Sequence, residues 1–214
     1  MHTQNIFNID DQQTIQKFID HHPFATTVVS TSQGVIADHI PLLRSVNTAD
    51  NITLIGHFAL ANSVVHELAA LEDNQSTILV IFQGDNHYIS PSWYASKAID
   101  GRVVPTWNYT AVHAYCTVKC HTDRTWLEAC LNTLTNKFEP QWSNWTMTDM
   151  PEDYAERLLS KIIGVELTVQ RLEVKFKLGQ NQPKVNQQSL LNAMTKNNLS
   201  TEMTQYLKQF GRLD

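Results

Sequence analysis

Alternating apolar and polar residues predict short β-strands over much of the first half of the chain. The segments are rich in β-branched residues and are separated by clusters of Gly, Asn, Asp and Ser, as strands and turns usually are. The last segment is almost continuously apolar, which is typical of a strand buried on both faces. The predicted strands are Phe24–Ser30, Val35–Leu43, Ile52–Phe58 and Ser76–Gln83, with turns at 32–34, 47–51 and 84–86.

Two later segments predict longer strands. Ala111–Cys120 alternates strictly, so its valines and cysteines share one face and its His, Tyr, Thr and Lys residues share the other. Val165–Leu178 alternates too, but its apolar positions shift by one residue half-way along. We expect a β-bulge near Gln170-Arg171 to absorb this shift, because a bulge inserts one extra residue into a strand.

Apolar residues at helical spacing predict several helices between and after these strands. Asp10 is a candidate N-cap for the first, and Asp149 for the fourth, with Pro151 in its first turn and Gly164 just past its end. The predicted helices span residues 10–22, 62–72, 122–138, about 150–163, 189–195 and 201–210.

Many short strands with a few helices favour a mainly β fold with α decoration (α+β), built as an antiparallel barrel. The 214 residues fit one domain with a small appendage, and the 42% hydrophobic share is ample for a core. We expect the barrel domain at 1–185. We expect the polar, Asn- and Gln-rich residues from 186 to 214 to form a helical tail that packs on the domain or on the partner subunit, or is partly disordered.

Charge and targeting signals narrow the function classes. The net charge is −5, and the 16 Lys and Arg residues form no basic stripe, so DNA binding by this chain alone is poorly supported. No apolar run approaches the length of a membrane span, and the first residues do not have the pattern of a signal peptide. Three cysteines argue against a disulfide framework, so we expect a cytoplasmic protein.

The stretch Asn86–Tyr109 gathers two tryptophans and three tyrosines around a polar loop. Each ring-bearing pair follows a proline, Pro91 or Pro105, which restricts the local backbone. Such rings suit a planar ligand or a subunit interface, but they also suit an ordinary packed hairpin. Both readings stay open at this point.

Several kinds of catalytic or binding site are not indicated. Cys116 and Cys120 share a strand face but lie about 13 Å apart at 3.3 Å per residue, so they cannot bind one zinc ion, and His113 points to the other face. We therefore expect no metal site. The chain contains no GxSxG, no phosphate loop of the GxxxxGK[ST] type and no GxGxxG after a strand.

Longer motifs carry a resemblance to a known family. They are FQG, ISPSWY and GRVVPTWNY followed by AVHA in and around the central stretch, and PFAT, HIPLL, GH-x-A-x-AN and LE-x-K-x-KL-x-QN elsewhere. Together, over about residues 6–185, they resemble the PaiB-like family of FMN-binding negative transcriptional regulators. The resemblance implies a split β-barrel related to pyridoxamine-phosphate oxidases, an FMN cofactor and a homodimer.

The resemblance also implies a set of cofactor-binding residues. Those along the strand pair Ala37–Arg44 and Ile52–Asn62, near which the flavin phosphate is expected, would line the flavin. The remaining polar residues come from later in the chain, and the partner subunit can supply them. The implied set is His39, Leu42, Gly56, His57, Ala59, Asn62, Arg102, Lys175, Gln180 and Asn181.

The chain departs from the family pattern at several positions. Leu60 stands where the family usually has Arg before the AN pair, Ser63 and Val65 replace Pro and Trp, and Gly179 replaces Ser. A guanidinium contact to a phosphate is worth roughly 1.5–3 kcal/mol, or about ten- to a hundredfold in affinity. Arg44 on the adjoining strand is a candidate to compensate.

Three functional hypotheses follow. The first is a homodimeric FMN-binding protein of the PaiB type, for which the resemblance makes DNA a possible partner although the charge does not support it. The second is an FMN-dependent oxidoreductase on the same barrel, since flavins chiefly confer redox chemistry. The third is a cofactor-free or haem-binding dimeric module, supported only by Leu60 and Gly179.

Overall fold

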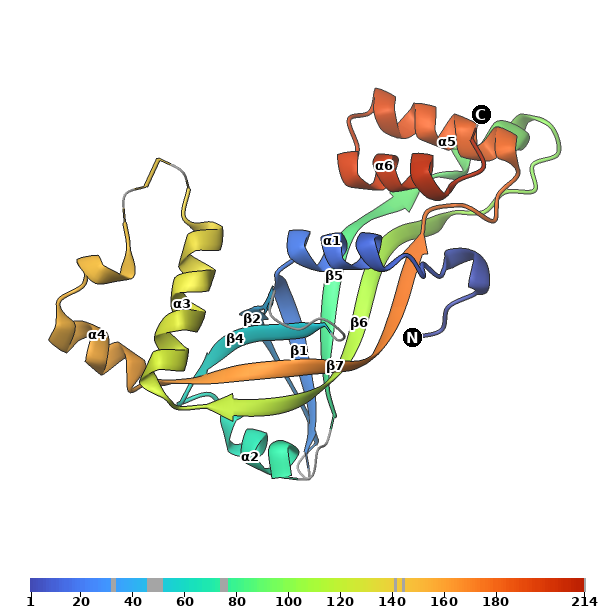
Figure 1. Ribbon diagram of the computed structural model, residues 1–214. Helices are drawn as coiled ribbons and strands as arrows, with labels where there is room; N and C mark the ends of the chain where they lie inside the picture. Colours follow the sequence, from blue (N-terminus) through green and yellow to red (C-terminus); the bar gives the residue numbers. More distant parts are fainter. Residues whose placement is uncertain (32–33, 46–51, 74–76, 141, 144, 214) are drawn as a thin grey trace. The chain divides into compact units, whose positions relative to one another are not determined.

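A computed structural model describes residues 1–31, 34–45, 52–73, 77–140, 142–143 and 145–213 (Figure 1). Its strands form one seven-stranded sheet in the order β2-β1-β5-β6-β7-β4-β3. The strands are β1 (Phe24–Thr31), β2 (Gly34–Pro41), β3 (Leu43–Arg44), β4 (Thr53–Ala59), β5 (Thr77–Ile89), β6 (Thr106–His121) and β7 (Ile162–Lys177).

Within these described ranges, six α-helices and four short 3-10 helices accompany the strands. The α-helices are α1 (Gln12–His21), α2 (Val65–Asp73), α3 (Arg124–Phe138), α4 (Glu152–Leu159), α5 (Lys184–Lys196) and α6 (Thr201–Phe210), and the 3-10 helices are η1 (Asn5–Phe7), η2 (Pro91–Trp93), η3 (Ala95–Ala98) and η4 (Met147–Asp149).

The chain divides into two compact units, to which the long strands β5, β6 and β7 both contribute. Unit 1 comprises Met1–Phe18, Gln83–Val112 and Glu173–Asp214. Unit 2 comprises Ile19–Phe82 and His113–Leu172.

Unit 2 contains the antiparallel pairings of β1 with β2 and β5, and of β4 with β3 and β7. Helix α3 packs on this part of the sheet, where Leu43, Cys130 and Leu134 form a buried cluster that Ile55 and Trp126 extend. Asp123 caps α3 by accepting a 2.9 Å hydrogen bond from the Trp126 backbone N–H, as a helix N-cap should.

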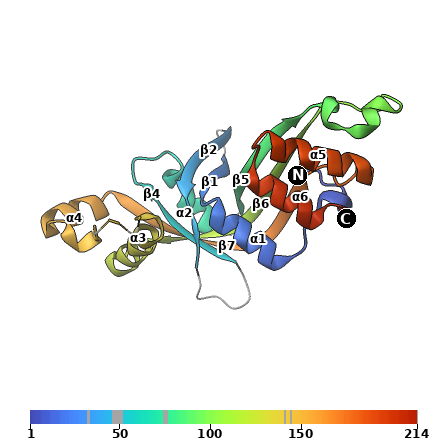
Figure 2. The same cartoon turned by 90° about the horizontal axis from the view of Figure 1, so that it is seen from above.

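Unit 1 is built around an aromatic core covered by the C-terminal helices. Phe176 of β7 is fully buried, and its ring centroid lies 5.0 Å from that of Phe18 and 4.7 Å from that of Tyr206. Helices α5 and α6 lie side by side in both views (Figures 1 and 2). The Asn186 side chain accepts a 3.0 Å hydrogen bond from the Ser96 backbone N–H and donates a 2.8 Å bond to the Ser96 hydroxyl. The tail is therefore docked within this unit.

The predicted fold class is confirmed: the protein is an antiparallel, mainly β structure with helices. The patterns of β6 and β7 are also confirmed. Val112, Ala114 and Cys116 are buried, while His113, Tyr115 and Thr117 between and after them are not. In β7, Gln170 and Arg171 are both exposed at the point where the buried phase shifts by one residue.

Some predicted boundaries and caps are wrong. Strand β5 does not turn at residues 84–86 but continues to Ile89, because buried Gly84 lets the backbone pass close to Phe18. A Cβ at Gly84 would lie 2.7 Å from the Phe18 ring. The carboxylate that accepts from the Thr14 N–H at the start of α1 belongs to Asp11, not Asp10. The predicted turns at 32–33 and 47–51 lie outside the described residues.

The start and end of the fourth helix also differ from prediction. Asp149 does not cap α4; its carboxylate accepts a 2.6 Å bond from the Thr146 N–H and closes η4 instead. Gly164 does not end the helix, which stops at Leu159, but lies inside β7 opposite His57. A glycine is needed at this position for β7 to pack against α3, since a Cβ there would overlap the ring of Trp126.

Within the part of the chain that the structure describes, no helix is both long and apolar enough to cross a membrane.

Candidate functional site

Six of the ten residues implied by resemblance lie in unit 2, on or beside β2 and β4. His39 on β2 is exposed, and its ring stacks against that of Phe24 with centroids 6.1 Å apart. Ala59, at the end of β4, is exposed as well. These two side chains are therefore accessible to a ligand.

Leu42 and Gly56 belong instead to the packed interior of the unit. Leu42 is fully buried, and a Cβ at Gly56 would lie 2.7 Å from the Pro41 carbonyl oxygen and 2.8 Å from the Leu42 side chain. Only a glycine allows β4 to approach this segment so closely. Their contribution to a ligand site is thus to hold β2 and β4 together, because their side chains are unavailable.

His57 is the most unusual polar group of β4. It is half-buried, and its Nδ1 atom is buried with no hydrogen-bond partner among the described residues. Burial lowers the pKa of His57 below its usual value of 6.5, because removing water disfavours the charged imidazolium. A neutral imidazole with a free nitrogen can still donate or accept one hydrogen bond to a ligand.

The neighbourhood of His57 is aromatic. Its cross-strand partner is Gly164, which lies beneath the ring of Trp126. That ring stacks on His121 with centroids 4.0 Å apart and planes within 1° of parallel. His121 Nε2 in turn lies 3.2 Å from the Glu166 carboxylate. Trp126 is thus held from two sides.

Asn62 organises the turn between β4 and α2. Its side-chain amide donates to the Asp38 carboxylate, and its Oδ1 accepts a 3.0 Å bond from the Val64 N–H. The other Asp38 carboxylate oxygen accepts a 2.7 Å bond from the backbone N–H of His39. Asp38 is a site residue that we did not predict, although its place directly before the HIPLL motif was a usable signal.

Arg44 is not free to replace the missing family arginine. Its guanidinium forms a bidentate ion pair with Asp20, with N–O distances of 2.7 and 2.5 Å. Both side chains are only a quarter to a third exposed, so this pair is a substantial structural contact. Leu60, at the position of that arginine, is 42% exposed.

The other four implied residues lie in unit 1. Arg102 is exposed on the loop before β6, where its Nε lies 4.0 Å from Asp100. Lys175 on β7 donates a 2.9 Å bond to the His2 carbonyl and lies over the Tyr109 ring at 5.3 Å. Each cation thus has a contact within unit 1, Arg102 with Asp100 and Lys175 with the His2 carbonyl and the Tyr109 ring.

Gln180 and Asn181 follow the end of β7. The Gln180 side chain is buried and closes the strand end, because it accepts from the Leu178 N–H at 2.8 Å and donates to the Phe176 carbonyl at 2.6 Å. Asn181 is exposed. Gly179 has φ +97°, a conformation that favours glycine, which explains why it suits this turn.

The aromatic stretch 86–109 divides between packed and exposed rings. Tyr94 is buried, whereas Trp107 is 55% exposed and meets Tyr88 edge-on, with centroids 6.2 Å apart. His87 stacks on Trp93 with planes within 7°. The packed-hairpin interpretation thus applies to Tyr94, whereas the exposed rings of Tyr88 and Trp107 remain candidates for a ligand or subunit interface.

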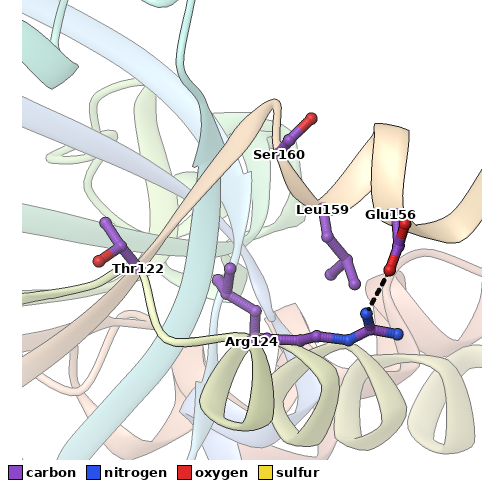
Figure 3. A pocket seen from close by; sticks show the side chains of 6 residues that line it. Thr122, Arg124, Glu156, Leu159 and Ser160 are labelled. Carbon is purple, nitrogen blue, oxygen red and sulfur yellow. Dashed lines mark hydrogen bonds and ion pairs between the residues drawn. The ribbon is translucent and has the colours of Figure 1, made fainter.

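A pocket of about 250 Å³ lies between α3 and α4 in unit 2 (Figure 3). Arg124 dominates its lining, but its guanidinium is bound to Glu128 at 2.7 Å and to Glu156 at 2.8 Å. With this positive charge already paired, the pocket has little capacity to bind an anion. Its lining residues are Thr122, Arg124, Leu127, Glu156, Leu159 and Ser160.

The buried cysteines do not supply a nucleophile. Burial raises the pKa of Cys116 to about 12 and that of Cys130 to about 11, so both thiols stay protonated near neutral pH. Within the described ranges, no three His, Cys, Asp or Glu side chains are grouped so that they could hold a metal ion.

The fold is that of the split-barrel proteins. The flavocytochrome Anf3 from Azotobacter vinelandii shares this fold, with a TM-score of 0.58 and 14% identity over 82% of this chain and 72% of that one.

The chain belongs to the family described as "Putative FMN-binding domain", which it matches over residues 1–171. It is 33% identical over 183 residues to the protease synthase and sporulation protein PAI 2 of Bacillus subtilis, covering 85% of this chain and 83% of the relative. It is also 33% identical over 198 residues to the uncharacterized protein AN0679 of Emericella nidulans, covering 78% and 79%. The resemblance to PaiB-like proteins is thereby confirmed, and with it FMN as the cofactor.

The residues of unit 2 fit the ring of a flavin better than they fit its phosphate. His57 offers a buried, unpartnered nitrogen, and exposed His39 offers a stacked imidazole. Such groups suit the polar edge and the face of an isoalloxazine ring, whose chemistry when bound is electron transfer. By contrast, the polar groups around Asn62 are already engaged with one another.

The lowered pKa of His57 has a consequence for stability. Below pH 6.5 the unfolded chain binds a proton at this residue more readily than the folded chain, so stability is full above this pH and falls as the pH falls below it. We expect the free energy of unfolding of the flavin-free protein to fall more steeply from about pH 8 to about pH 5.5 than that of His57→Gln. Urea titrations across this range measure both slopes. Because both proteins keep His121 and Glu166, equal slopes would show that residue 57 does not contribute.

Proposed function

We propose that the chain binds FMN along β2 and β4, with His57 against the polar edge of the flavin ring and His39 beside the ring face. The buried Nδ1 atom of His57, which has no partner among the described residues, carries this proposal. A buried polar atom is normally hydrogen-bonded, so an unpaired one within a family motif points to a ligand. Leu42, Gly56, Ala59 and Asn62 complete the wall as scaffold.

We further propose that the protein is a cytoplasmic homodimer whose second copy supplies Arg102, Lys175 and Asn181. Gln180 would position Asn181, because its own side chain is buried at the end of β7. The exposed rings of Tyr88 and Trp107 support an interface, because exposed clusters of large apolar side chains are uncommon on monomers. A regulatory role of the PaiB type is favoured by the 33% identity to a protein named for protease synthesis and sporulation. The net charge of −5 favours regulation through a partner over direct DNA binding.

The oxidoreductase hypothesis is the second candidate. Its support is the absence of a basic stripe in the sequence together with a cofactor whose chemistry is redox. Anaerobic mixing of the FMN-loaded protein with NADH or NADPH tests it, because reduction bleaches the flavin in the visible range. Loss of colour supports an enzyme; unchanged colour with both donors favours the regulator.

The site assignment is tested by measuring flavin content after a single substitution. We expect His57→Ala to lose about five- to 150-fold in FMN affinity, since removing a buried hydrogen-bond partner costs about 1–3 kcal/mol. Fluorescence titration with FMN measures the dissociation constant. His66→Ala, an exposed histidine on α2, is the matched control and should bind as the parent does. Equal affinity for all three proteins would move the site away from β4.

A further inference from the structure

The β2–β4 end of unit 2 has an acidic group where a phosphate-binding site would need a basic one. The Asp38 carboxylate is held by the Asn62 side-chain amide and the His39 N–H. These are the kinds of donors that would otherwise bind phosphate oxygens. A fixed carboxylate that uses them also repels a second anion at the same place.

The adjoining position offers no cation. Leu60 presents a 42% exposed apolar side chain, and its backbone N–H is bound to the Lys161 carbonyl at 2.8 Å. The Arg44 guanidinium is held by both carboxylate oxygens of Asp20. A phosphate placed here would have to break that ion pair to gain a charge partner.

The start of α2 is occupied as well. The N–H of Val64 binds the Asn62 side chain at 3.0 Å, that of Val65 binds the Asn62 carbonyl at 3.0 Å, and that of Glu67 binds the Val64 carbonyl at 3.0 Å. Glu67 in the first turn already complements the helix dipole. The helix N-terminus thus has little left to offer an anion.

The net charge of unit 2 is also unfavourable for binding a phosphate. Unit 2 contains seven Lys and Arg against fourteen Asp and Glu, while unit 1 holds the remaining nine and seven. A phosphate monoester carries about −1.5 to −2 charges at pH 7. The unit that contains β2 and β4 therefore repels a phosphate more strongly than the chain average suggests.

We propose that this site binds the flavin through its ring and ribityl chain and does not select for the terminal phosphate. Riboflavin, the same flavin without that group, then binds about as tightly as FMN. This inference rests on the proposed flavin site along β2 and β4. Asp38 and Leu60 are the residues that set this specificity. The Asp38 carboxylate repels the phosphate, and the apolar Leu60 side chain provides no positive charge to bind it.

Three cations compete with this interpretation. Lys161 has an exposed side chain and its backbone carbonyl is bound to Leu60, and the proposed second copy would supply Arg102 and Lys175. If one of these cations reached the phosphate, FMN would bind more tightly than riboflavin, and replacing that residue by Gln would weaken FMN binding alone. Under the proposal, Lys161→Gln, Arg102→Gln and Lys175→Gln each leave the FMN and riboflavin affinities nearly equal to one another.

The test is a pair of fluorescence titrations, with FMN and with riboflavin, on the full-length protein and its variants. We expect the parent dissociation constants to agree within about threefold. Leu60→Arg should tighten FMN binding about ten- to a hundredfold, and Asp38→Asn should tighten it severalfold. Leu60→Arg should not alter riboflavin affinity by more than about threefold. Val185→Arg on α5 controls for net charge, since that side chain is 51% exposed in unit 1.

Two results would overturn the inference. The first would leave the proposed flavin site intact, and the second would rule out that site as well. FMN binding more than about tenfold tighter than riboflavin to the parent, with Leu60→Arg having no effect, would refute the inference but leave the flavin site standing. No binding of either flavin to the parent or to Leu60→Arg would remove the proposed site along with it. Thermal melts of each variant confirm that it is folded.

Discussion

Phe176→Ala is expected to lower the free energy of unfolding by about 3–5 kcal/mol, the usual cost of removing a fully buried phenylalanine. Phe176 has no exposed surface, and its ring is packed against Phe18 on one helix and Tyr206 on another. A third ring, that of Phe210, meets it edge-on at 6.1 Å. The substitution therefore leaves a cavity at the point where α1 and α6 meet β7.

Chemical denaturation measures the loss, and hydrogen exchange locates it. Since α6 docks on Phe176, amides of residues 201–210 should lose protection before the strands of unit 2 do. The matched control is Phe138→Ala at the end of α3, where the side chain is 47% exposed and should change stability by less than about 1 kcal/mol. A Phe176→Ala protein as stable as this control would show that the aromatic core of unit 1 contributes little.

The surface on which α5 and α6 dock could not be predicted from the sequence, whose polar segment after Pro183 indicated a helical tail packed on the domain or on a partner, or partly disordered. The deciding groups are few and distant in sequence. Asn186 reaches Ser96 across ninety residues, and Tyr206 reaches Phe176 across thirty. Local composition cannot reveal such contacts, because it carries no information about what lies opposite a polar side chain.

Strand patterning, by contrast, was predictable where one face is buried. The alternation of β6 and the phase shift of β7 at Gln170-Arg171 follow directly from burial on alternate faces. The prediction of a turn at Gly84 was wrong because glycine has two uses. It allows unusual backbone angles, and it also allows close packing, which is its role beneath Phe18.

For the candidate site, too, the sequence predicted the location but not the role of each residue. Motif resemblance led to β2 and β4, but it treated every matching residue as a possible ligand contact. Leu42 and Gly56 turn out to be packed inside, and Gln180 closes the end of β7 with its own side chain. Arg44 appeared free on a neighbouring strand, yet Asp20, twenty-four residues earlier, binds it. Which charges remain available is a property of the tertiary structure.

Gly164→Ala is expected to cost about 3 kcal/mol in stability, at the upper end of what one extra methyl group costs in a packed core. The added Cβ would overlap the ring of Trp126 and lie 3.1 Å from Leu127. The ring cannot easily move away, since it is stacked on His121 at 4.0 Å. Because Gly164 pairs with His57 across β7 and β4, the disturbance should reach the proposed flavin site and weaken FMN binding as well.

A double-mutant cycle with Trp126→Leu separates this clash from a general weakening of β7. Trp126→Leu alone should destabilise through lost packing, but it makes room for the new methyl group. The double variant should therefore be more stable than the sum of the two single losses by at least about 1 kcal/mol, the coupling that residues in contact show. Urea titrations of the four proteins measure this coupling, and FMN titrations of the same set show whether flavin affinity recovers with it. Additive losses would mean that the glycine at 164 is needed for the strand and not for the ring above it.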